Sequence, residues 1–94
     1  MNIRRIVLDV MKPHEPDIVS MADVLSNLPN VTAVNIAVVE IDKAVENIKV
    51  TIEGVGLRFK QIERQMRELG AAIHSIDLVV AGKEIIEETK TPQD

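Results

Sequence analysis

The sequence contains no cysteine, tryptophan or tyrosine, and only one phenylalanine among its 94 residues. Without cysteine the chain can form neither disulfides nor thiolate metal sites, and it has no cysteine nucleophile. The scarcity of aromatic rings leaves little for base stacking or for an aromatic cage around a cation. Hydrophobic residues still make up 46% of the chain, so the core must consist of isoleucine, valine, leucine and methionine.

Positive charge is also scarce, because 11 Lys and Arg residues stand against 15 Asp and Glu residues, for a formal net charge of -4. Binding to a phosphate backbone needs clustered Lys and Arg, so nucleic acid is disfavoured as a partner. The N-terminal sequence MNIRRIVLDV lacks a signal-peptide cleavage site, and no apolar run is long enough to cross a membrane. These features predict a soluble cytoplasmic protein without a membrane partner, and they imply no cofactor.

Six secondary-structure elements follow from the spacing of the apolar residues. Alternation with period two predicts strands over residues 3–11 and 47–54, and runs rich in β-branched and other apolar residues predict strands over residues 31–42 and 71–82. Helical spacing predicts helices over residues 16–28 and 59–69. We expect residues 1–86 to form a single domain, followed by a charged, flexible C-terminal tail at residues 87–94.

The order β-α-β-β-α-β is typical of a ferredoxin-like α+β sandwich. Right-handed crossovers would place both helices on one face of a four-stranded antiparallel sheet with strand order 4-1-3-2. The strands at residues 31–42 and 73–82 then lie at the two edges, and both are rich in apolar residues. Because uncovered apolar edges favour association, we expect a homo-oligomer through these two strands. Pairing of one edge with the other is head-to-tail and closes into a ring.

Four segments carry a resemblance to a known family. They are RRIVLDVMKPHEPDIV (4–19), VNIAVVEID (34–42), ENIKVTIEG (46–54) and IHSIDLVVAGK (73–83). Together they resemble the small archaeal proteins grouped as domain of unknown function 211, over about residues 2–86. The resemblance implies a ferredoxin-like fold, an archaeal cytoplasmic origin and oligomeric assembly. It implies no established activity.

The turn DVMKPHEPDIV (9–19) looks most like a site. His14, Glu15 and Asp17 offer nitrogen and oxygen ligands in one loop, and Ca²⁺ or Mg²⁺ is bound by several carboxylate or carbonyl oxygens. The competing interpretation is structural: the two prolines end a strand, and Asp17 stabilises the positive end of the following helix. The turn alone does not decide between the two interpretations.

Pairing of the first and fourth strands would bring further carboxylates to this end of the sheet. If the strand ends align, Asp9 faces Ser75 and lies diagonal to Asp77, at about 7 Å, on the face away from the helices. The predicted cation ligands are therefore Asp9, His14, Glu15 and Asp77. His74 lies near the same end, but its parity with inward-facing neighbours predicts a half-buried structural histidine. Alternatively, Arg5 or a cation of a neighbouring subunit neutralises the two aspartates.

The segment GVGLRF (54–59) resembles the GVxFR anion loop of acylphosphatases, in which backbone amides and an arginine hold phosphate. Gly56 and Arg58 at a helix N-terminus would then bind an anion. The competing interpretation is a glycine break between a strand and a helix. No serine stands in a nucleophile elbow or has an evident histidine–acid pair, and no dinucleotide or Walker motif is present.

The sequence thus favours a non-enzymatic, ring-forming homo-oligomeric domain that binds a ligand or partner. Two alternatives stay open: a divalent cation-binding protein that uses the acidic residues at the sheet end, and a regulatory domain that binds a small metabolite between subunits.

Overall fold

The computed structural model describes residues 2–87. They form four strands and two helices in the predicted order β-α-β-β-α-β. The elements are β1 (Ile3–Pro13), α1 (Ile18–Ser26), β2 (Val31–Ile41), β3 (Val45–Gly54), α2 (Phe59–Glu68) and β4 (Ala72–Ala81). The sheet is antiparallel throughout, in the predicted order β2-β3-β1-β4. The ferredoxin-like α+β fold is confirmed. Of the predicted flexible tail at residues 87–94, residues 88–94 lie outside the described residues.

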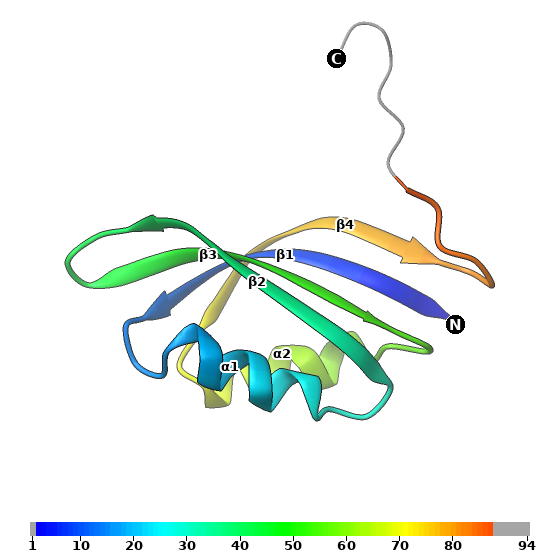
Figure 1. Ribbon diagram of the computed structural model, residues 1–94, viewed down its shortest axis with the longest axis horizontal. Coiled ribbons are helices and arrows are strands. Elements are labelled where there is room, and N and C mark those ends of the chain that lie inside the picture. The colour runs from blue at the N-terminus through cyan, green and yellow to red at the C-terminus, as the bar shows by residue number, and fades with distance from the viewer. Residues whose placement is uncertain (1, 88–94) are drawn as a thin grey trace, which may run out of the picture.

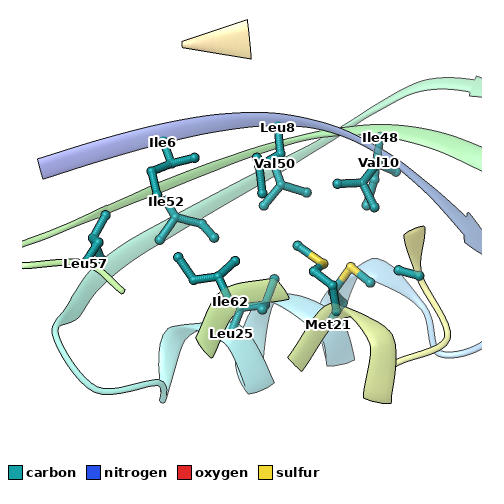
Figure 2. Close-up of a cluster of buried hydrophobic side chains, with 12 residues drawn as sticks. Ile6, Leu8, Val10, Met21, Leu25, Ile48, Val50, Ile52, Leu57 and Ile62 are labelled. Carbon is teal, nitrogen blue, oxygen red and sulfur yellow. The ribbon is translucent and has the colours of Figure 1, made fainter. Parts of the chain in front are cut away.

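Both helices lie on one side of the sheet, and the segment that follows β4 rises on the other side, as Figure 1 shows. We call the side away from the helices the open face. Alternate residues of the central strands β1 and β3 point toward the helices and meet the apolar side chains of α1 and α2 (Figure 2). The buried core comprises Ile6, Leu8, Val10, Met21, Leu25, Ile48, Val50, Ile52, Leu57, Ile62, Met66 and Ala71. As the composition predicts, it contains no aromatic ring.

The first helix begins where a side chain can satisfy its free backbone N–H groups. Asp17 is the N-cap, and its Oδ1 accepts a hydrogen bond from the backbone N–H of Ser20 at 2.8 Å. This bond holds the pKa of Asp17 below its ordinary value. The predicted structural role of Asp17 is confirmed. Pro16, however, lies before the cap rather than in the first helical turn, so the helix starts two residues later than predicted.

Two β-bulges interrupt β4 where it pairs with β1. The residues of β4 that lie opposite the inward-facing residues of β1 are Ile73, Ile76 and Val79. The register shifts three times along this pair, and His74 and Asp77 are the extra residues of β4 at two of the shifts. Positions of β4 opposite the inward-facing residues of β1 therefore recur every third residue instead of every second. His74 is therefore exposed. The predicted half-burial of this histidine is wrong, because a bulge interrupts the alternation of inward-facing and outward-facing side chains along the strand.

Neither helix of the described chain is long and apolar enough to span a membrane.

Candidate functional site

The predicted pairing of carboxylates between β1 and β4 is present in part. Asp9 lies opposite Ser75 in the register, as expected from aligned strand ends. The hydroxyl of Ser75 donates a hydrogen bond to Oδ1 of Asp77 at 2.7 Å. Asp77 belongs to a bulge and is exposed. Asp9 and Asp77 thus lie on the neighbouring strands β1 and β4, and the hydroxyl of Ser75 contacts Asp77.

The other two predicted ligands do not complete a cation site. The ring of His14 is hydrogen-bonded to partners in the β2–β3 hairpin, and Glu15 is exposed to solvent. Within residues 2–87, no group of three or more His, Cys, Asp or Glu side chains is arranged to hold a metal ion. A cation site built from Asp9, His14, Glu15 and Asp77 stays a prediction, and no preformed cluster supports it.

A buried lysine lies at the end of β1 beside the proline turn. Lys12 is only 1% exposed. Its Nζ donates hydrogen bonds to the carbonyl oxygen of Pro13 at 2.7 Å and to Oε1 of Glu46 at 3.2 Å, and it has a longer contact of 3.4 Å with the carbonyl oxygen of His14. A buried ammonium group needs such partners because its desolvation is costly. Sequence reasoning missed Lys12, although it continues the inward parity of Ile6, Leu8 and Val10.

Glu46 joins Lys12 to His14, and we call these three residues the sheet-end cluster. Nδ1 of His14 lies 2.9 Å from Oε2 of Glu46, and Nε2 lies 3.0 Å from the carbonyl oxygen of Lys43. Both partners are hydrogen-bond acceptors, so only the doubly protonated imidazolium satisfies both contacts. The hydrogen bond to Glu46 is the main reason that the pKa of His14 is raised, and the same bond lowers the pKa of Glu46.

The sheet-end cluster predicts a pH-dependent contribution of His14 to stability. Folding raises the pKa of His14 above its ordinary value of 6.5, so the contribution is complete below that value and is lost as pH rises through the raised pKa. The difference in Tm between wild type and His14→Gln should therefore be largest near about pH 5.5 and shrink by about pH 8.5. Thermal unfolding followed by circular dichroism measures this difference. A difference that stays constant with pH would contradict the prediction.

Arg5 does not neutralise the aspartates, contrary to one of the sequence-based alternatives. Its Nε donates to Oε2 of Glu53 at 2.7 Å, and its Nη1 and Nη2 donate to the two carboxylate oxygens of Glu87 at 3.0 and 2.9 Å. The reason is register: Glu53 lies directly opposite Arg5 on β3, whereas Asp9 lies four residues further along β1. These hydrogen bonds raise the pKa of Arg5, with the bond to Glu87 as the largest cause.

The glycines of GVGLRF have structural explanations. A Cβ atom on buried Gly54 would collide with the backbone oxygen of Asn30 and with the side chain of Leu57. Gly56 has a φ of 70°, and its N–H donates to Oδ1 of Asn2 at 3.0 Å. The N–H that an anion loop would use is therefore engaged. These contacts support the interpretation of the segment as a break between β3 and α2.

Exposed apolar side chains gather on the two outermost strands. On β2 they are Val38 (41% exposed), Val39 (68%) and Ile41 (62%), and on β4 they are Ile76 (50%) and Val79 (53%). Within the described chain, the outer side of neither strand pairs with another strand. The edges are thus apolar as well as unpaired, which is the combination that the sequence predicts.

Comparison with known proteins agrees with the resemblance carried by the four sequence segments. The model of the family DUF211, described as "Uncharacterized ArCR", matches residues 4–94. An uncharacterized protein of Methanocaldococcus jannaschii is 62% identical over 92 residues, which is 98% of this chain and 95% of the relative. Neither description names an activity. Because both matches extend over nearly the whole chain, the protein belongs to the DUF211 family.

Proposed function

We propose that the protein is a non-enzymatic cytoplasmic domain that assembles head-to-tail into a homo-oligomeric ring and presents its open face to a ligand or partner. The observation that carries the proposal is the pair of unpaired edges, each with large exposed apolar side chains. Single exposed apolar residues are ordinary, but a row of them on an unpaired strand is typical of a surface that another chain covers.

Strand polarity supports pairing of β4 with β2 of the next copy. β2 runs antiparallel to β3, β3 to β1, and β1 to β4, so β2 and β4 run in opposite directions within one copy. A second copy placed beside the first in the same orientation therefore continues the antiparallel sheet and keeps all helices on one side. The lengths also match, since β2 has 11 residues and β4 has 10.

A twofold dimer covers the edges less completely. Pairing of β2 with β2 of a second copy would leave both β4 edges uncovered, with Ile76 and Val79 in water. Pairing of β4 with β4 would leave Val39 and Ile41 exposed in the same way. Head-to-tail pairing covers every edge once the chain of copies closes, and the twist between neighbouring strands favours closure over a flat array.

The side chains that look most reactive in the sequence are held in structural contacts, which supports a binding role rather than catalysis. His14 is hydrogen-bonded to Glu46, and Arg5 is hydrogen-bonded to Glu53. Asp17 caps α1. Side chains that act as a base or nucleophile instead need a geometry that leaves them free to reach a substrate.

The mass of the protein in solution tests this proposal. Light scattering coupled to gel filtration should give the mass of a closed assembly of at least three copies, and the mass should stay constant over a tenfold dilution in the micromolar range. A strict monomer at micromolar concentration would refute the assembly.

A further inference from the structure

The segment after β4 is held at its start by one backbone and one side-chain hydrogen bond, and it then rises on the side of the sheet away from the helices (Figure 1). The N–H of Gly82 donates to the carbonyl oxygen of Asn2 at 2.7 Å, and Nη1 of Arg4 donates to the carbonyl oxygen of Lys83 at 2.6 Å. The segment ends, within the described chain, on the contact between Glu87 and Arg5. We call residues 82–87 the strap. Its last described residue, Glu87, thus brings a carboxylate to Arg5 of the central strand β1.

The guanidinium group of Arg5 is oriented by a contact within the sheet that does not involve the strap. Arg5 and Glu53 lie opposite each other on β1 and β3, and Nε of Arg5 donates to Oε2 of Glu53 at 2.7 Å. Nη2 of Arg5 also lies 2.7 Å from the same Oε2 of Glu53, so Glu53 fixes the plane of the guanidinium group from one side. Nη1 and Nη2 also form a bidentate contact with the carboxylate of Glu87. The side chain of Arg5 is only 17% exposed, whereas that of Glu87 is 75% exposed. The side chain of Arg5 is thus fixed by the sheet, whereas the side chain of Glu87 is largely in solvent.

A hollow surrounds the ion pair. It has a volume of about 300 Å³, and it is lined by Arg5, Val7, Lys49, Thr51, Glu53, Leu78 and Glu87. Arg5 and Lys49 supply two positive charges, Thr51 supplies a hydroxyl group, and Val7 and Leu78 supply an apolar wall. An oriented arginine beside an apolar wall is suited to an organic acid with one carboxylate and a short hydrocarbon body.

We propose that this hollow is a binding site for a small organic carboxylate. Arg5 binds the carboxylate of the ligand, and Glu53 positions Arg5. In the absence of ligand the carboxylate of Glu87 binds Arg5 instead, and the ligand displaces it. The strap therefore acts as a competitor tethered to the same chain. This proposal goes beyond assembly and does not depend on it, because Arg5, Lys49 and Thr51 lie on the two central strands.

Displacement of Glu87 is physically reasonable because the pair is exposed on one side. Exposed ion pairs are weak, since each partner keeps much of its hydration. The contact with Arg5 lowers the pKa of Glu87, so the occupant is an ionised carboxylate at neutral pH, as an organic acid would be. A tethered competitor leaves the site open for only a fraction of the time, and the apparent Kd of an added ligand equals its intrinsic Kd divided by that fraction.

Titration with valerate, followed by ¹H–¹⁵N NMR, tests the site. In the Glu87→Gln variant, valerate should shift the amide signals of Val7, Lys49 and Thr51 saturably, with a Kd on the order of millimolar, and at least about fivefold more tightly than in wild type. Glu84→Gln removes a charge from the same strap and serves as the matched control, which should bind like wild type. Valeramide, which has the same body without the charge, should cause no saturable shift.

The Arg5 variants decide whether the shifts report the proposed contact. Arg5→Gln should abolish valerate binding. Arg5→Lys should weaken it, because lysine keeps the positive charge but cannot form a bidentate contact with a carboxylate. The same spectra show whether each variant is folded. Equal affinity in wild type and Glu87→Gln, binding that survives Arg5→Gln, equal binding of valeramide, or no binding to any folded variant would each overturn the proposal.

Discussion

Replacement of Val39 by lysine should dissociate the proposed ring into folded monomers. Val39 lies on the outer strand β2 and is 68% exposed, so the substitution costs a single copy little stability. At an interface between edges, the same lysine would place an unpaired ammonium group against apolar side chains. Burial of an unpaired charge costs at least about 3 kcal/mol, which corresponds to about a hundredfold increase in the Kd of each contact. Light scattering of the variant measures the outcome.

The exposed valine Val19 offers a matched control. It is 75% exposed, but it lies on α1 rather than on an edge strand. Val19→Lys adds the same charge and removes the same side chain, and it should leave the mass of the assembly unchanged. If Val19→Lys dissociates the assembly as strongly as Val39→Lys does, the contact does not run through the strand edges.

The second large effect is expected at Gly54, where alanine should destabilise the fold by about 3 kcal/mol. The added Cβ would meet the backbone oxygen of Asn30 and the side chain of Leu57, so the end of β3 must move away from the start of β2. A backbone oxygen cannot turn away as the tip of a long side chain can. Urea unfolding, with the midpoint converted to a free energy of unfolding, measures the loss.

Gly56 is the control within the same short segment. A Cβ atom there meets nothing within 4 Å, but its φ of 70° is unfavourable for alanine, at a cost of about 1 kcal/mol. Gly56→Ala should therefore be clearly milder than Gly54→Ala. The opposite ranking would mean that the conformation of the loop, rather than the close approach at Gly54, is the reason for these glycines.

Much of the fold could be predicted from the sequence because local patterns dominate it. The alternation of Ile48, Val50 and Ile52 and the helical spacing of Ile62 and Met66 place these residues in the core, where the structure has them. Once the six elements are in order, the handedness of the crossovers leaves a single strand order. The same reasoning failed for His74, since a bulge depends on how β4 pairs with β1 and has no signature in the residues of β4 alone.

The contacts of the candidate sites were harder to predict because they join residues far apart in the chain. His14 and its partner Glu46 are 32 residues apart, and Glu46 lies outside the strands predicted over residues 31–42 and 47–54. Arg5 and Glu87 are 82 residues apart. Lys12 is the exception, because its parity with the inward residues of β1 already indicates burial of a charge.

Assembly and ligand binding would act on different parts of the same sheet. The edges β2 and β4 would join copies, whereas the hollow at Arg5 lies over the central strands and reaches only Leu78 on the side of β4. A ring built in this way would carry one carboxylate site per copy on its open face. The two proposals can fail separately, because the mass of the assembly and the binding of valerate are independent measurements.

Mixing of two edge variants tests head-to-tail assembly most directly. Val39→Lys disables β2 and leaves β4 intact, whereas Val79→Lys disables β4 and leaves β2 intact. For a head-to-tail contact, each variant alone should be a monomer, and an equimolar mixture should give a one-to-one dimer that grows no further, as native mass spectrometry would show. If either variant alone still forms a dimer, or if the mixture contains only monomers, copies do not join through β2 and β4.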